Sequence, residues 1–226
     1  MPHGGPHGSF VQALTSMRYV LLKMGYGLLL PNFSGSAGYG KGHLHGALKN
    51  IGEKDAKEIV DVLNKVLTDN PNIDKGNVHL QGGSYGGYMS AILGSRYPQY
   101  FKSAIILNGV LNIMANLWFT DIPEWNITEA LGKRGLADLT EEDYLAMWKQ
   151  SPLGKPMAIP TLQFLGAKDR RVPYRQGLFF DAITKAAGTP ITTYVYENSN
   201  HGLADSVETS FDIVVKSILF LETQSP

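Results

Sequence analysis

The sequence predicts a protein of the α/β class, in which a mostly parallel sheet is covered by helices. Apolar runs of strand length alternate along the chain with longer amphipathic segments of helical period. A serine flanked by glycines stands between a strand-like and a helix-like segment. The chain has 226 residues, of which 43% are hydrophobic, so we expect one domain with a substantial core over residues 1–226.

The expected elements follow from the spacing of apolar side chains and from capping signals. Short apolar runs predict strands at residues 27–31, 78–81, 103–107, 161–165 and 191–196. Helical spacing predicts helices at residues 9–24, 52–69, 88–93, 140–148 and 207–218. Thr140 and Asp143 are typical of a capping box at a helix start. The segment 109–157 is less periodic and reads as an insertion, and a glycine-rich loop is expected at 35–40.

Composition excludes several classes of protein. Lys+Arg and Asp+Glu number 20 each, so no charge excess favours nucleic acid or a strongly charged partner. The absence of cysteine excludes disulfides, cysteine-bound zinc and a thiol nucleophile. No apolar run is long enough to span a membrane, and His43 and His45 lack the carboxylate neighbours of a metal site. We therefore expect an intracellular globular protein without a membrane segment or a metal site.

The serine between glycines is Ser84, within Gly82-Gly83-Ser84-Tyr85-Gly86. A G-x-S-x-G sequence between a strand and a helix is typical of a nucleophile elbow, a sharp turn that lifts the serine hydroxyl above the sheet. The glycines are needed there because the backbone is strained and a Cβ would collide with neighbouring elements. The sequence therefore predicts Ser84 as a nucleophile.

A nucleophilic serine needs a base and an acid that orients the base. In a parallel sheet of this kind we expect them in loops after later strands, in the order Ser, Asp, His. Asp169 follows the expected strand at 161–165, and His201 lies between the strand at 191–196 and the last helix. Taken alone, Asp169 could cap a turn and His201 could be a surface histidine. Their order after Ser84 favours a catalytic triad.

Hydrolysis by a serine also needs N–H donors for the oxyanion that forms on the attacked carbonyl. The backbone N–H of Tyr85, directly after Ser84, is expected to be one donor. The second donor is expected from Gly4 or Gly5, where the absence of a side chain lets the backbone approach a substrate closely. The alternative is that these glycines belong to a disordered start of the chain.

Five motifs together resemble the catalytic domain of the acylpeptide-hydrolase (acylaminoacyl-peptidase) branch of the prolyl oligopeptidase family of serine peptidases. They are H-G-G-P-H at 3–7, N-F-S-G-S-A-G-Y-G at 32–40, G-G-S-Y-G-G at 82–87, T-D-I-P-E-W at 120–125 and D-R-R-V-P at 169–173. The resemblance implies an α/β-hydrolase fold and the release of an N-acylated amino acid from the blocked N-terminus of short peptides. It also implies a cytosolic enzyme that needs no cofactor and is often a homo-oligomer.

The resemblance also bears on substrate binding. Arg171 is similar to a basic residue that some relatives place near the substrate, whereas Ser34 stands where the family usually has an arginine. Apolar side chains of the insertion are candidates to line a pocket for the acyl group, although each could equally belong to the core: Trp118, Phe119, Ile122 and Trp125.

Two features of the family are not found in this sequence. Its members carry an N-terminal β-propeller, and the resembling fold places a central strand before the H-G-G-P loop, between the strands at 27–31 and 78–81. The sequence therefore predicts an N-terminally truncated catalytic domain. The alternatives are a dipeptidyl-peptidase or carboxylesterase of the same fold, or a truncated product without catalytic activity that acts by binding a full-length homologue.

Overall fold

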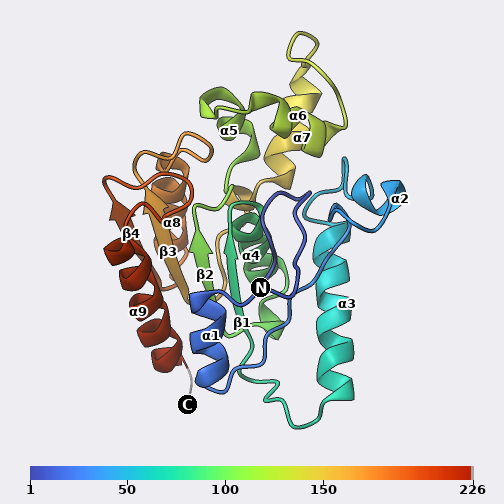
Figure 1. The fold of residues 1–226 in the computed structure, drawn as a ribbon. Helices are drawn as coiled ribbons and strands as arrows, with labels where there is room; N and C mark the ends of the chain where they lie inside the picture. The colour runs from blue at the N-terminus through green and yellow to red at the C-terminus, as the bar shows by residue number, and fades with distance from the viewer. Residues whose placement is uncertain (225–226) are drawn as a thin grey trace.

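The computed structural model describes residues 1–224 and contains a four-stranded parallel sheet (Figure 1). The strands lie in the order in which they occur in the chain: β1 (His79–Gly83), β2 (Ser103–Leu107), β3 (Thr161–Gly166) and β4 (Ile191–Tyr196). In register, His79 is opposite Ser103, Ala104 opposite Thr161, and Thr161 opposite Ile191. The expected parallel sheet is therefore confirmed for four of the five predicted strands.

Helices cover both faces of this sheet. Apolar side chains of α3 (Lys54–Asp69), α4 (Tyr85–Arg96) and α8 (Arg175–Ala186) form one core with one face of the strands. Side chains of α1 (Ser16–Lys23) and α9 (Val207–Gln224) form a second core with the other face. β2 serves both cores, because Ala104 and Ile106 point to one face and Ile105 to the other.

The insertion after β2 forms helices that stand above the sheet in Figure 1. They are α5 (Ile113–Phe119), α6 (Pro123–Leu131) and α7 (Glu141–Gln150). The capping box predicted at the start of α7 is confirmed: the Thr140 and Asp143 side chains and backbone groups bond reciprocally. The α5 and α6 helices were not predicted, because their apolar residues pack against several neighbours and show no single period. Short helices at Lys41–Leu44 (α2), Pro98–Tyr100 and Pro152–Gly154 complete the fold.

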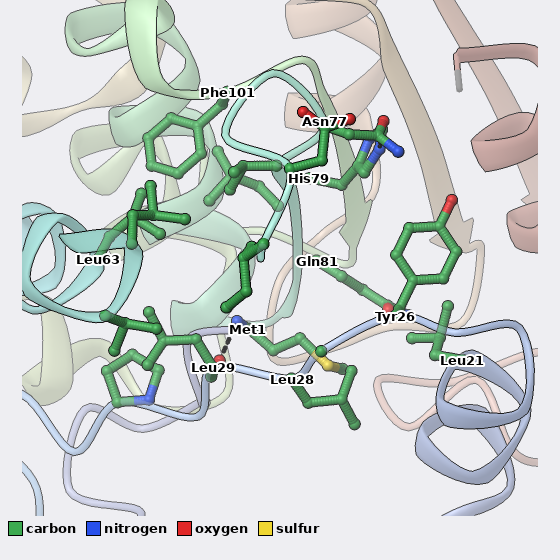
Figure 2. A pocket seen from close by; sticks show the side chains of 18 of the residues that line it. Met1, Leu21, Tyr26, Leu28, Leu29, Leu63, Asn77, His79, Gln81 and Phe101 are labelled. Carbon is green, nitrogen blue, oxygen red and sulfur yellow. Dashed lines mark hydrogen bonds between the residues drawn. The ribbon is translucent and has the colours of Figure 1, made fainter. Parts of the chain in front are cut away.

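The strand expected at residues 27–31 is wrong, since this segment forms no ladder with any strand of the described chain. A cavity of about 690 Å³ separates it from β1, and Figure 2 shows Met1, Leu28 and Leu29 along one side of this cavity, across from His79. A strand requires a neighbour for its backbone N–H and C=O groups. The cavity lies where the resemblance places a further strand.

At the edge of this cavity, the start of the chain contacts the backbone of the segment 27–31. The terminal ammonium group of Met1 donates a hydrogen bond of 2.7 Å to the carbonyl oxygen of Leu29. Burial lowers the pKa of this ammonium group to about 5. Within residues 1–224, no helix combines the length and the apolar composition needed to cross a membrane.

Candidate active site

Ser84 lies at the turn between β1, which ends at Gly83, and α4, which begins at Tyr85. Its backbone has φ 57° and ψ −122°, a conformation that residues other than glycine rarely adopt. The Ser84 N–H donates to the carbonyl of Leu107 at 2.9 Å, and the Ser84 carbonyl accepts the N–H of Tyr88 at 3.0 Å. These bonds hold the strained turn, so Ser84 has the backbone of the predicted nucleophile elbow.

The glycines around Ser84 are required by close packing. A Cβ on Gly82 would collide with the backbone of Gly86, and a Cβ on Gly86 would collide with the carbonyl of Pro2. A Cβ on Gly87 would lie 2.7 Å from the Cα of Gly109. A side chain at any of these positions would therefore push β1, α4 or the segment that contains Pro2 away from its neighbour.

Asp169 and His201, which the sequence places after two different strands, meet in the structure. Asp169 follows β3, His201 follows β4, and Nδ1 of His201 lies 2.7 Å from Oδ2 of Asp169. The other carboxylate oxygen of Asp169 accepts the N–H groups of Arg171 (2.8 Å) and Val172 (2.9 Å). The Asp169 side chain is fully buried, whereas that of His201 is 29% exposed. A fixed, buried carboxylate thus contacts one side of an imidazole that is partly exposed.

Asn108 connects the histidine loop to the elbow and was missed by the sequence analysis. Its side-chain amide donates to the carbonyls of Asn200 (3.2 Å) and His201 (3.0 Å), and its Oδ1 accepts the N–H of Gly166 (2.8 Å). The preceding residue, Leu107, bonds to the backbone of Ser84. Asn108 therefore joins the ends of β2 and β3 to the loop that carries His201.

A signal for Asn108 exists in the sequence, although it is weak. The residue directly follows β2 and has φ 42°, in the left-handed region that asparagine tolerates better than most side chains. An asparagine after a strand is common in ordinary turns, so only the fold reveals which carbonyls its amide contacts.

The loop that contains Gly4 and Gly5 packs against the elbow. A Cβ on Gly4 would lie 3.4 Å from the Gly83 carbonyl and 3.5 Å from Cβ of Ser84. Tyr85 is the first residue of α4, and the N–H groups of a first helical turn have no acceptor within the helix. The structure therefore brings the three predicted oxyanion residues to the side of Ser84.

Two histidines anchor this loop. His3 is buried, stacks on Phe33 with ring centroids 4.4 Å apart, and places Nε2 2.7 Å from the Ser36 hydroxyl. Burial lowers the pKa of His3. His7 places Nδ1 2.8 Å from the carbonyl of Gly35. The loop that contains Gly4 and Gly5 is thus held against the glycine-rich loop at 35–40 through His3 and His7.

Tyr85 has a second, unforeseen partner in its side chain. Its hydroxyl donates a short hydrogen bond to the carboxylate of Asp55, on α3. Both residues are fully buried, and burial raises the pKa of Asp55 to about 6. In the sequence Asp55 reads as an ordinary polar residue at a helix start, because its burial depends on how α3 meets α4.

The remaining predicted residues take different positions. Arg171 forms a two-pronged ion pair with Asp121, at 2.6 and 3.3 Å, and its guanidinium lowers the pKa of that carboxyl. Trp118 is mostly exposed and stacks on Tyr144. The ion pair ties the segment after Asp169 to the end of α5.

Of Phe119, Ile122 and Trp125, only Phe119 lines the cavity beside Asp169. Phe119 lines a cavity of about 640 Å³, whose wall also includes Asp169 and Phe179. Ile122 is half-buried before α6. Trp125 turns its indole N–H to the carbonyl of Gly5, at 2.9 Å. The structure thus places Phe119 at a cavity beside Asp169 and Trp125 at the predicted oxyanion loop.

The sequence matches known proteins along almost its whole length. The sequence model of the prolyl oligopeptidase family matches residues 12–224. The acylamino-acid-releasing enzymes of Sus scrofa and Homo sapiens are each 36% identical to this chain over 228 residues. Each match covers 99% of this chain but only 31% of the enzyme.

Solved structures of acylaminoacyl peptidases are also similar to this chain. The acylaminoacyl peptidase of Pyrococcus horikoshii superposes with a TM-score of 0.89 and 26% identity, covering 98% of this chain and 36% of that one. The dipeptidyl peptidase 4 of Porphyromonas gingivalis, at 17% identity and a TM-score of 0.80, shows the fold alone. The chain therefore has the α/β-hydrolase fold and belongs to the prolyl oligopeptidase family.

Proposed function

We propose that this chain is the catalytic part of a serine peptidase that releases an N-acylated amino acid from the blocked N-terminus of short peptides. Ser84, His201 and Asp169 act as nucleophile, base and orienting acid. The proposal is supported by the identity to acylamino-acid-releasing enzymes over nearly the whole chain. The observation that carries the chemistry is the 2.7 Å contact between His201 and the buried Asp169, on the loops after β4 and β3.

In the acylation step, Nε2 of His201 removes the proton of the Ser84 hydroxyl as Ser84 attacks the carbonyl of the acylated residue. Asp169 accepts the Nδ1–H of His201 and stabilises the imidazolium that forms. The charge on the carbonyl oxygen is stabilised by the N–H groups of Tyr85 and of Gly4 or Gly5. His201 then gives its proton to the leaving amine, and the shortened peptide departs.

In the deacylation step, His201 removes a proton from water, and the resulting hydroxide attacks the ester carbonyl of Ser84. The same N–H donors stabilise the second oxyanion. His201 returns the proton to Ser84, which releases the N-acylated amino acid. Every proton therefore passes through His201, and the proposed chemistry needs neither a metal nor a cofactor.

Substrate contacts are proposed for the residues around this centre. Phe119, at the cavity beside Asp169, is the best-placed of the predicted apolar residues to contact an acyl group, and Trp118 and Ile122 belong to the same insertion. Arg171 is held by Asp121 near the orienting carboxylate, so its guanidinium is a candidate to meet the peptide. A similar acylaminoacyl peptidase has been solved in complex with Z-Gly-Gly-Phe-chloromethyl ketone, which supports a peptide substrate. We also propose a cytoplasmic, homo-oligomeric enzyme.

The function is tested by comparing three chromogenic substrates with the parent chain and with Ser84→Ala. Acetyl-alanyl p-nitroanilide represents a blocked N-terminus, alanyl-alanyl p-nitroanilide a free amine, and p-nitrophenyl butyrate a simple ester. We expect the highest kcat/KM for the acetylated anilide and no turnover of any substrate by Ser84→Ala. Preference for the free amine would instead support a dipeptidyl-peptidase, and turnover of the ester alone would support a carboxylesterase.

A further inference from the structure

Helix α6 contacts the predicted oxyanion loop through two side chains one helical turn apart. Trp125 donates its indole N–H to the carbonyl of Gly5 at 2.9 Å. Glu129 places Oε1 2.9 Å from Nε2 of His7. Residues four apart lie on the same face of a helix, so both contacts come from one face of α6. That face therefore contacts the loop at Gly5 and at His7.

Trp125 also contacts the other predicted source of an oxyanion donor. Its ring meets the ring of Tyr85 edge-on, with centroids 6.1 Å apart and an angle of 73° between the planes. The Tyr85 hydroxyl is held in turn by the buried carboxylate of Asp55. A single side chain thus contacts both Gly5 and Tyr85, which come from distant parts of the sequence.

The backbone at Gly4 and Gly5 depends on contacts made by other residues. Gly4 and Gly5 have no side chains to pack, and Gly5 has φ 122°, so this backbone has many alternatives once its contacts are removed. Nδ1 of His3 lies 2.8 Å from the carbonyl of Gly4 and restrains the peptide plane that also carries the Gly5 N–H. Trp125 restrains the next peptide plane. Together these two contacts restrain the peptide planes on both sides of the Gly5 Cα.

Glu129, which makes the contact of α6 with His7, is a buried residue. Its side chain is only 4% exposed, and burial raises the pKa of its carboxyl. Oε1 contacts His7, whereas the buried Oε2 has no hydrogen-bond partner. Because His7 also contacts the Gly35 carbonyl, the imidazole is fixed from two sides and cannot rotate freely.

We propose that Trp125 and Glu129 are positioning residues that hold the Gly4–Gly5 backbone and Tyr85 in the arrangement that stabilises an oxyanion. An oxyanion hole accelerates a reaction only when its donors are already oriented before charge develops. The proposal rests on the proposed function, because it assumes that Ser84 forms a tetrahedral intermediate. It differs from the sequence prediction for Trp125, in which the ring lines the acyl pocket.

The two roles for Trp125 give different kinetics. A pocket residue contacts substrate in the ground state and in the transition state alike, so its loss raises KM and leaves kcat unchanged. A positioning residue of the oxyanion hole acts when charge develops, so its loss lowers kcat and leaves KM unchanged. Trp125→Phe separates them, since phenylalanine keeps an aromatic ring beside Tyr85 but has no N–H to donate to Gly5; the smaller ring volume is matched in the control Trp148→Phe.

The test measures two quantities on the full chain. The first is the rate of Ser84 labelling by a fluorophosphonate, with kcat and KM for acetyl-alanyl p-nitroanilide. The second is hydrogen–deuterium exchange of the peptide covering residues 1–10, which reports on the loop whatever the enzyme's activity. The variants are Trp125→Phe, Glu129→Ala and Glu129→Gln. Trp148→Phe, a partly exposed tryptophan of α7, is the matched control.

We expect Trp125→Phe and Glu129→Ala to lower the labelling rate and kcat about 10-fold, less than the ~10²–10³-fold cost of losing an oxyanion donor itself. KM should change less than two-fold, and exchange in residues 1–10 should become faster. Glu129→Gln keeps an oxygen acceptor for His7 and should restore most of the rate. Trp148→Phe should match the parent.

Two results would overturn the proposal. One is a Trp125→Phe enzyme with raised KM and unchanged kcat and labelling, which would place the ring in the substrate pocket. The other is unchanged exchange of residues 1–10 in both Trp125→Phe and Glu129→Ala. Failure of the proposed function is recognised separately, because the parent itself would then not react with fluorophosphonate, and the exchange comparison would still decide whether α6 holds the loop.

Discussion

The hydroxyl of Tyr85 donates a hydrogen bond to the carboxylate of Asp55, and both side chains are fully buried. The contact joins the first residue of α4, directly after the elbow, to the first turn of α3. Burial raises the pKa of Asp55 from its usual 3.8 to about 6. This carboxyl therefore loses its proton at a higher pH in the folded protein than in the unfolded chain.

We predict that Asp55 makes the protein less stable as pH rises from about 4 to about 6. In this window the folded state keeps the proton on Asp55 while the unfolded chain has released it, so the free energy of unfolding falls with rising pH. The pKa difference corresponds to at most about 3 kcal/mol. Asp55→Asn still accepts a hydrogen bond from Tyr85 and should remove this slope.

The prediction is checked by urea unfolding of the parent and Asp55→Asn at several values of pH between 4 and 7. The stability of the variant relative to the parent should increase across this range. Parallel stability curves would show that the Asp55 carboxyl does not titrate in this window.

For Asp169→Asn, we predict that kcat falls about 10⁴-fold, with little change in KM. The two backbone N–H groups that bond to the carboxylate select the oxygen of the new amide, which turns its NH₂ group toward His201. Nδ1 of His201 must then accept a hydrogen bond instead of donating one, which places the ring proton on Nε2, so Nε2 can no longer act as the base. Asp74→Asn, on the surface, is the control. A loss below 10-fold would contradict the orienting role of Asp169.

Replacing Asn108 is predicted to cost both stability and reactivity. Asn108→Ala leaves three buried or partly buried backbone groups without their partner, at about 1–3 kcal/mol each. Asn108→Gly removes the same amide but suits the positive φ of this residue. We expect slower fluorophosphonate labelling in both variants and a higher Tm for glycine than for alanine. Parent-like labelling of Asn108→Gly would show that the amide does not position His201.

Gly86→Ala is predicted to prevent the N-terminal loop from packing on the elbow. The new methyl group would collide with the carbonyl of Pro2, and backbone on both sides leaves no room to adjust. We expect a loss of Tm of several degrees and loss of fluorophosphonate labelling. Gly42→Ala, whose methyl group would meet no atom within 4 Å, should leave both unchanged. Normal labelling of Gly86→Ala would contradict the packing of this loop as the second oxyanion donor.

The sequence predicted the parts of the fold whose signals are local. Four strands, the capping box of α7 and the elbow around Ser84 depend on apolar runs, capping side chains and glycines that lie close together in the chain. Asp169 and His201 were found because their order after the elbow follows from the parallel topology. Their 2.7 Å contact is the outcome that this order predicts.

The failures concern relationships between distant segments. Residues 27–31 have the apolar pattern of a strand but lack a neighbour, because a cavity lies between them and β1. The roles of Asn108 and Asp55 depend on which backbone or side chain they meet across the fold. Trp125 was a candidate pocket residue because it is apolar, and the contact of its indole N–H with the carbonyl of Gly5 was not expected. No local pattern in the chain shows these contacts.

Fluorophosphonate labelling read by intact mass, on the parent and on Ser84→Ala, tests the central claim most directly. The reaction requires a deprotonated serine and an oxyanion site, but no particular peptide. We predict one adduct per chain on the parent and none on Ser84→Ala. An unlabelled parent, or equal labelling of both proteins, would contradict the assignment of Ser84 as the nucleophile of an assembled catalytic site.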